Sequence, residues 1–379
     1  MLSNVSIKAL YGLYSYTLDF HPKQKPYRFV TGPNAYGKTS LLKMIESLYK
    51  QDFGGLSKVV FDEFQLFFDD GFQIRIGQQR IYNDDPNSDD TMPKKVVLSF
   101  SSKSANRMST EDFFEWESDN AAEIKLNNMM AYLASHPIYF ITDNRLYKGG
   151  SELTAGQALQ GEMKTYLQNL SGKLNSALQQ GMLDEHESIT EEYYNERVSS
   201  LKPLIDSVVK YELVKRNPIP AYSVEKSAFC NTCIIALEKA LEGDVLDNIV
   251  RLDSFCLIVD NYDFANKKME LSPYFGFRFK AADEMASILS FDQLSSGERH
   301  IILMNYDILF DVSDEALVLI DEPELSFHLE WQGQFMTNLE ELEGVRKDLQ
   351  FIICTHAPEM FSYQWDLSVD LFDQANKQK

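Results

Sequence analysis

The segment Gly32-Pro33-Asn34-Ala35-Tyr36-Gly37-Lys38-Thr39 decides the fold. It matches G-x-x-x-x-G-K-[ST], a loop whose backbone N–H groups surround phosphate oxygens while its lysine reaches the outer phosphates. A strand is expected before the loop at 27–30, and apolar residues recur at helical spacing after it, from Leu41 to Leu48. The sequence therefore predicts a strand, a phosphate-binding loop and a helix, with the hydroxyl of Thr39 directed to Mg²⁺.

A second segment, Leu317-Val318-Leu319-Ile320-Asp321-Glu322-Pro323, follows Thr39 after 277 residues and supplies two carboxylates. Its unbroken apolar run is typical of a central parallel strand that is buried on both faces. Because successive strand residues point in different directions, Asp321 can face Mg²⁺ while Glu322 accepts a proton from an attacking water. The alternative is an ordinary strand that ends in a solvated acidic turn. The presence of the phosphate-binding loop favours a nucleotide site over this alternative.

A third segment, Leu294-Ser295-Ser296-Gly297-Glu298, lies about 20 residues before the acidic strand. Ser295 or Ser296 is suited to cap a helix, with Glu298 in its first turn. Capped helices are common, so the segment gains significance only from its position in the chain.

A fourth segment is another apolar strand, Leu349 to Thr355, and it ends at His356. A single histidine is most often an ordinary core or surface residue. At the carboxyl end of a strand next to the acidic strand, however, His356 would lie where open α/β sheets bind ligands.

The order of these four segments resembles that of ATP-binding cassette ATPases: Walker A, signature, Walker B and histidine switch. The long stretch between the first two is similar to the SMC/RecF class. Four motif sequences are closer to a particular group, the bacterial AAA family ATPases of anti-phage systems, which they resemble: "LSSGERH", "LVLIDEPELSFHLEWQ", "ICTHAPEM" and "QWDLSVDL". This group includes the PARIS-system ATPase and the overcoming-lysogenization-defect proteins.

The resemblance implies an α/β fold: a P-loop ATPase head with a mixed sheet, an antiparallel β lobe and a helical insertion. It also implies ATP and Mg²⁺ as ligands, and slow hydrolysis that requires two copies to enclose ATP. For binding the nucleotide it assigns Gly32, Pro33, Asn34, Ala35, Tyr36, Gly37, Lys38, Thr39 and Ser40, and for the partner copy's nucleotide it assigns Ser295, Ser296, Gly297 and Glu298. For the metal it assigns Thr39, Asp321 and Asn144. For catalysis it assigns Lys38, Glu322 and His356.

The chain departs from the family pattern in three places. Ala35 replaces a usual glycine, which is tolerable if its backbone angles are ordinary. Ser296 and Glu298 replace the first glycine and the glutamine of the signature. Asn144 takes the position of the usual Q-loop glutamine and also belongs to the nucleotide site; Gln65 and Gln73 are alternatives.

We expect three parts along the chain. Residues 1–145 form the first half of the ATPase head with the β lobe, 146–262 a helical insertion, and 263–379 the second half of the head. Only 23 residues follow His356, too few for the TOPRIM nuclease domain that overcoming-lysogenization-defect enzymes carry.

The composition of the chain narrows the class of protein and its compartment further. No apolar run approaches the 18 residues of a transmembrane helix, and the N-terminus lacks a secretory pattern, so we expect a cytoplasmic protein with four reduced cysteines. The Cys230/Cys233 pair is expected in the core, with zinc as the minor alternative. A formal charge of −21 disfavours DNA and favours a partner with a basic surface.

The leading functional hypothesis is an ATP-dependent sensor or scaffold in an anti-phage or toxin–antitoxin-like system. It would form homodimers, with higher assemblies left open, respond to a phage-encoded trigger, and control a separate effector of the nuclease class. The alternative is a RecF-like repair ATPase that clamps DNA, so direct DNA binding stays open. A transporter subunit is disfavoured by the long insertion.

Overall fold

The computed structural model describes residues 1–20, 25–82, 93–103, 112–118, 128–142, 152–215, 217–265, 267–281 and 287–377. The chain divides into two compact units, of which the first comprises Met1–Asp143 and Val312–Lys379 and the second Asn144–Asp311. The second unit therefore contains residues 263–311, which the sequence had assigned to the second half of the head. Residues 263–311 belong to the second unit because of local packing: helix α8 (Ser296–Tyr306), which follows the signature segment, packs on helix α7 (Asp244–Asn261) of this unit.

The first unit contains a fully parallel sheet of five strands in the order β14-β3-β13-β12-β8. Its strands are β3 (Tyr27–Thr31), β8 (Ile138–Ile141), β12 (Leu317–Asp321), β13 (Gln350–Cys354) and β14 (Ser368–Asp370). The central strands β12 and β13 are apolar and buried along their length, as expected for strands covered on both faces. The carboxyl ends of β3, β12 and β13 thus meet at one edge of the sheet.

The same unit contains an antiparallel sheet of six strands, the β lobe, in the order β2-β1-β4-β5-β6-β7. Its strands are β1 (Leu2–Leu10), β2 (Tyr14–Asp19), β4 (Glu63–Phe68), β5 (Gln73–Ile81), β6 (Lys95–Lys103) and β7 (Asp112–Glu117). These strands alternate between buried apolar and more exposed polar residues, the pattern of a sheet covered on one face.

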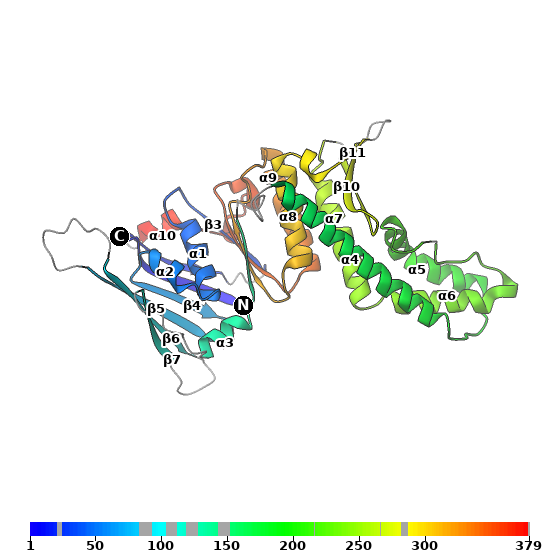
Figure 1. The fold of residues 1–379 in the computed structure, drawn as a ribbon, viewed down its shortest axis with the longest axis horizontal. Helices are drawn as coiled ribbons and strands as arrows, with labels where there is room; N and C mark the ends of the chain where they lie inside the picture. Colours follow the sequence, from blue (N-terminus) through cyan, green and yellow to red (C-terminus); the bar gives the residue numbers. More distant parts are fainter. Residues whose placement is uncertain are drawn as a thin grey trace. The chain divides into compact units, whose positions relative to one another are not determined.

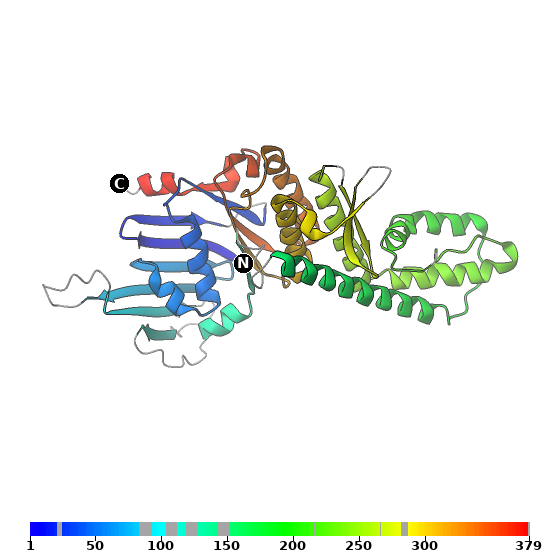
Figure 2. The same cartoon turned by 45° about the horizontal axis from the view of Figure 1, so that its top comes forward.

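Helices cover the buried face of the β lobe, and Figure 2 shows α1 lying across it. The helices of this unit are α1 (Lys38–Tyr49), α2 (Phe53–Lys58), α3 (Asn128–Ala134), α9 (Leu329–Val345) and α10 (Leu371–Lys377). The apolar side of α1 is fully buried in a core that it shares with both sheets. This core fixes α1, whose first residue is Lys38, relative to the parallel sheet.

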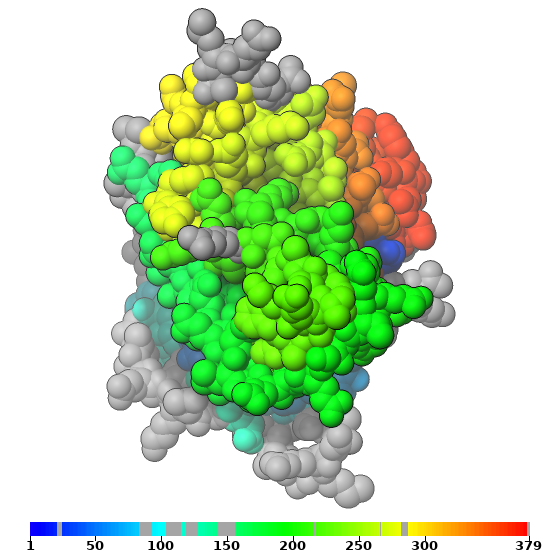
Figure 3. Space-filling view, turned by 90° about the vertical axis from the view of Figure 1, so that its right-hand side faces the viewer, coloured from blue at the N-terminus to red at the C-terminus, as the bar shows by residue number. Residues whose placement is uncertain are grey.

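The second unit is mostly helical, and Figure 1 shows its long helices α4 to α7. Its elements are α4 (Glu152–Gly181), α5 (Glu191–Lys210), α6 (Ser227–Ala240), α7 (Asp244–Asn261), β9 (Lys267–Ser272), β10 (Gly276–Ala281), β11 (Ile288–Leu289), α8 (Ser296–Tyr306) and a π-helical turn at Asp307–Asp311. The strands form one antiparallel sheet in the order β11-β10-β9. Within this unit α4 contacts α6, α7 and β10, and the same segments adjoin in the space-filling view (Figure 3).

The predicted α/β fold class with an antiparallel β lobe and a helical insertion is confirmed, but the sheet predicted to be mixed is parallel in all five of its described strands. Within the described ranges, no helix has the length and apolar character required to cross a membrane. All four cysteines are buried thiols, including Cys230 and Cys233 on α6.

Candidate nucleotide site

The predicted phosphate-binding loop joins β3 to α1, and two glycines allow its path. Gly32 and Gly37 have φ angles of 138° and 88°, which residues with a side chain rarely adopt. A Cβ added to Gly37 would lie 2.6 Å from Cδ2 of Leu10. Gly37 is also the N-cap of α1 and supplies no side-chain cap, so the positive end of this helix is suited to an anion.

Ala35 does not have the ordinary backbone angles on which its tolerance was expected to depend. Its φ is 71°, in the left-handed region where a Cβ approaches the following carbonyl oxygen. The condition under which alanine was expected to be tolerated here is therefore not met. The backbone strain at Ala35 lies within the loop.

Tyrosines hold the rest of the loop and the start of α1. The hydroxyl of Tyr16 donates to the carbonyl oxygen of Tyr36 at 2.8 Å, and the hydroxyls of Tyr11 and Ser40 lie 2.7 Å apart. Pro33 and Asn34 are exposed, and Thr39 is partly buried in the first turn of α1. Since Ser40 is already engaged by a protein hydroxyl, Thr39 is the better-placed hydroxyl for a metal ion.

Glu322 lies outside the strand, in a turn that directly follows Asp321, so strand alternation does not set its direction. Asp321 is the last residue of β12, and Glu322 has a φ of 47°. The Glu322 N–H donates to the Cys354 carbonyl oxygen of the neighbouring strand at 2.8 Å. The left-handed turn redirects the chain directly after the strand, and strained residues of this kind are concentrated at functional sites.

Lys38, His356 and Glu322 meet at the carboxyl edge of the parallel sheet. Nε2 of His356 lies 2.6 Å from Nζ of Lys38 and 2.9 Å from Oε1 of Glu322. Nζ of Lys38 also donates to the Gly32 carbonyl oxygen at 2.9 Å. Burial lowers the pKa of Lys38, against the opposing effect of Glu322. The predicted adjacency of the histidine strand and the acidic strand is confirmed, since β13 pairs with β12.

Glu324 lies beside this triad and was not among the predicted site residues. Its Oε1 accepts a hydrogen bond of 2.6 Å from the backbone N–H of His356, and its Oε2 is buried. Burial raises the pKa of Glu324 above its ordinary value, although the His356 N–H and the Thr355 hydroxyl act in the opposite direction. Glu324 thereby holds the backbone of the residue whose ring contacts Lys38 and Glu322.

The signature segment lies in the second unit, at the start of α8. Ser295, and not Ser296, is the N-cap, and it forms a reciprocal capping box with Glu298. The two carboxylate oxygens of Glu298 are engaged by Lys267 at 2.6 Å and by the Ser295 N–H at 2.7 Å. Gly297 is buried in the first turn. Glu298 therefore stabilises the local structure of the segment.

The Q-loop assignment cannot be placed, because Asn144 lies outside the described residues. Its alternatives Gln65 and Gln73 lie on β4 and β5 of the β lobe. A carboxylate at Asp321 and a hydroxyl at Thr39 are the oxygen donors that suit Mg²⁺. In the ranges with assigned structure, no three His, Cys, Asp or Glu side chains are grouped as a metal site.

A family model, AAA_21, described as "AAA domain, putative AbiEii toxin, Type IV TA system", matches residues 161–362, just over half of the chain. This range includes the signature segment, the acidic strand and His356. The chain is 31% identical over 108 residues to the "Retron Ec83 probable ATPase" of Escherichia coli, and the match spans 26% of this chain and 19% of that relative.

Solved structures with similar folds include SMC head domains. The Pyrococcus furiosus Smc head with an extended coiled coil, bound to the C-terminal domain of ScpA, has a TM-score of 0.43 at 12% identity and covers 95% of this chain and 91% of that one. The SMC head of Thermotoga maritima has a TM-score of 0.38 at 9% identity and covers 97% and 92%.

Proposed function

The chain belongs to the AAA_21 family, and from this membership we propose that it binds ATP with Mg²⁺ and hydrolyses it. We further propose that ATP binding switches a two-copy assembly that acts as the sensor or scaffold of an anti-phage defence system. The observation that carries the nucleotide part is the meeting of Lys38, Glu322 and His356 beside the uncapped start of α1.

Each group of this edge has a role that its position supports. The N–H groups of the loop and the start of α1 would bind the phosphates, and Lys38 would exchange the Gly32 carbonyl oxygen for an outer phosphate oxygen. Thr39 and Asp321 would hold Mg²⁺, which supplies positive charge against the phosphate oxygens.

Glu322 is the proposed acceptor of the proton from the attacking water. His356 contacts it through Nε2, so the imidazole can orient the carboxylate. Glu324 would act on neither water nor phosphate, because its Oε1 accepts the backbone N–H of His356 and its Oε2 is buried.

The two-copy arrangement rests on the resemblance to ATP-binding cassette enzymes. In that arrangement the Ser295–Glu298 segment of one copy faces the nucleotide of the other. The structure of the segment suits this role, because the N-terminus of the eleven-residue α8 follows Ser295 and can bind a phosphate through its N–H groups.

The proposed defence role is supported by two of the similarities above. The family description names a toxin and a type IV TA system, and the partial relative is a retron ATPase. The effector is proposed to be a separate protein with a basic surface, because the chain has a formal charge of −21, and a nuclease such as a TOPRIM enzyme is the expected class.

The test uses Glu322→Gln with saturating Mg-ATP. Loss of the general base should reduce phosphate release by about 10²–10⁴-fold and leave an ATP-bound dimer detectable by light scattering after gel filtration. Lys38→Ala should bind no nucleotide. A monomeric Glu322→Gln that hydrolyses ATP at the wild-type rate would show the composite site to be wrong.

Two further measurements separate the defence role from DNA repair. Copurification from cells that express the neighbouring genes should yield an effector bound in a nucleotide-dependent manner. Tight, salt-sensitive binding of duplex DNA by the chain alone would instead favour a DNA-clamping ATPase.

A further inference from the structure

The first unit contains a pocket of about 250 Å³ at the amino ends of β12 and β13. It therefore lies at the opposite edge of the parallel sheet from Lys38, His356 and Glu322. The end of α1, at Tyr49, also lines it, so α1 spans the distance between the phosphate loop and this pocket. None of the nucleotide-site residues lines the pocket, which makes it a separate site.

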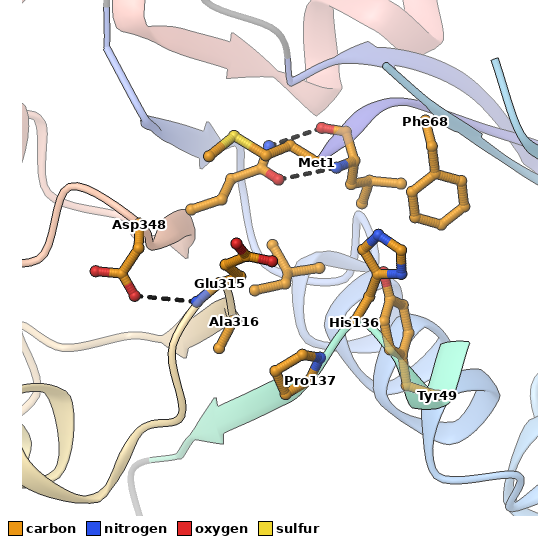
Figure 4. A pocket seen from close by; sticks show the side chains of 11 residues that line it. Met1, Tyr49, Phe68, His136, Pro137, Glu315, Ala316 and Asp348 are labelled. Atoms are coloured by element: carbon orange, nitrogen blue, oxygen red, sulfur yellow. Dashed lines mark hydrogen bonds between the residues drawn. The ribbon is translucent and has the colours of Figure 1, made fainter. Parts of the chain in front are cut away.

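One side of the pocket is aromatic. Figure 4 shows the rings of Tyr49, Phe68 and His136 gathered on that side. The His136 ring stacks on Tyr132 with centroids 4.2 Å apart, and Tyr132 meets the Phe68 ring edge-to-face at 4.9 Å. Nδ1 of His136 lies 2.8 Å from the Tyr132 carbonyl oxygen. These contacts fix the rings of Phe68 and His136 in place before any ligand arrives.

The other side of the pocket carries two carboxyl groups with different surroundings. Asp348 is paired with the fully buried Arg346 at 3.1 Å. Although burial alone would raise the pKa of Asp348, the hydrogen bonds from Arg346 lower it. Asp348 also accepts the backbone N–H of Glu315 at 3.0 Å. Its charge is thus compensated within the protein.

Glu315 is different. Its carboxylate is exposed and lies between Asp348 and the aromatic side (Figure 4). Among the described residues it has no ion-pair partner, and its φ of 59° together with the bond to Asp348 fixes its backbone. The carboxyl end of α1 adds negative potential nearby. The pocket therefore combines aromatic rings with the exposed Glu315 carboxylate, and the Met1 ammonium group that also lines it pairs with Asp69 at 3.9 Å.

We propose that this pocket binds a small organic cation whose head is a guanidinium group on a short apolar stem. A planar guanidinium can stack on aromatic rings and donate two parallel hydrogen bonds to one carboxylate, whereas an ammonium cannot do both. The volume exceeds that of a cavity that holds benzene, about 150 Å³, and is smaller than typical drug-sized sites. One head group and a stem of a few carbons fill it.

The test compares butylguanidinium with butylurea, which has nearly the same shape but no charge. Ligand-observed NMR titrations of the full chain should show saturable binding of butylguanidinium, and at least tenfold weaker binding of butylurea. Glu315→Gln should weaken butylguanidinium about tenfold, the effect of losing one charge-assisted contact. Glu315→Lys should abolish binding, because the new ammonium group repels the probe.

The matched control is Glu196→Gln, which removes the same charge from an exposed position on α5 and should leave binding unchanged. Equal binding of the two probes, or binding that survives in Glu315→Lys, would overturn the proposal, as would the absence of saturable binding. If Glu315→Lys has a lower melting temperature than the wild type, the proposal is judged from Glu315→Gln and from the comparison with butylurea instead. The experiment needs no ATP, so its outcome is independent of the proposed ATPase function.

Discussion

Ala35→Gly should stabilise the protein, although glycine usually weakens a folded state. Ala35 is exposed and has a φ of 71°, and a left-handed conformation costs a residue with a Cβ about 1–2 kcal/mol. Glycine removes this cost but gives the unfolded chain more freedom, worth about 0.4–1 kcal/mol. The net gain is about 1 kcal/mol, which raises the melting temperature of a unit of this size by roughly 2–4 °C.

The assay is thermal unfolding followed by circular dichroism, with Ala131→Gly as the matched control. Ala131 is an exposed residue inside α3 of the same unit, where glycine costs about 0.5–1 kcal/mol. The same chemical change should therefore raise the melting temperature at one position and lower it at the other. An Ala35→Gly protein that melts at or below the wild-type temperature would refute the argument that the loop is strained.

Two other predictions concern the same unit. Gly37→Ala should destabilise it by about 2–4 kcal/mol, because its φ of 88° and the 2.6 Å approach to Leu10 combine backbone strain with overpacking. Gly54→Ala in α2, where the added Cβ meets nothing closer than 3.6 Å, should be neutral or stabilising in the same melt. Glu324→Gln should flatten the pH dependence of stability, because the Glu324 carboxyl has a raised pKa in the folded state. Its contribution to the free energy of unfolding is fully present below the unfolded-state pKa and is lost as pH rises through the folded-state pKa. Urea titrations at a series of pH values measure this, and an unchanged difference between variant and wild type at every pH would contradict it.

The sequence predicted those parts of the site that depend on chain direction and strand order. The phosphate loop had to lie at the start of α1, and the apolar runs ending at Asp321 and Cys354 had to be central strands. Their carboxyl ends therefore had to meet at one edge of the sheet. The capping pattern at Ser295 and Glu298 was also predictable, because both residues lie in one helical turn.

Other features depend on contacts between residues that are far apart in the chain, and the sequence could not provide them. Glu324 follows Glu322 by two residues, but its bond is to the backbone of His356, 32 residues later. A buried carboxylate directly after the Walker B proline was the available signal. The φ of Ala35 depends on the closure of the loop between β3 and α1, which residue type alone does not determine. The pocket beside Glu315 forms because the end of α1 lies beside the starts of β12 and β13.

The contacts of His356 explain why the edge of the sheet is suited to an anion. Nε2 can donate one proton or accept one, but it lies within bonding distance of both the Lys38 ammonium and the Glu322 carboxylate. If Nε2 carries a proton, it donates to Glu322, and Lys38 keeps the Gly32 carbonyl oxygen at 2.9 Å and Nδ1 of His356 at 3.3 Å as acceptors. If Nε2 is bare, it accepts from Lys38 and no longer donates to Glu322. A phosphate oxygen next to Lys38 would accept a hydrogen bond from the ammonium group and leave Nε2–H to donate to Glu322. An anion at this position would therefore give Lys38 a charged acceptor and leave Nε2 of His356 to Glu322, which is why the carboxyl edge of the sheet suits a phosphate.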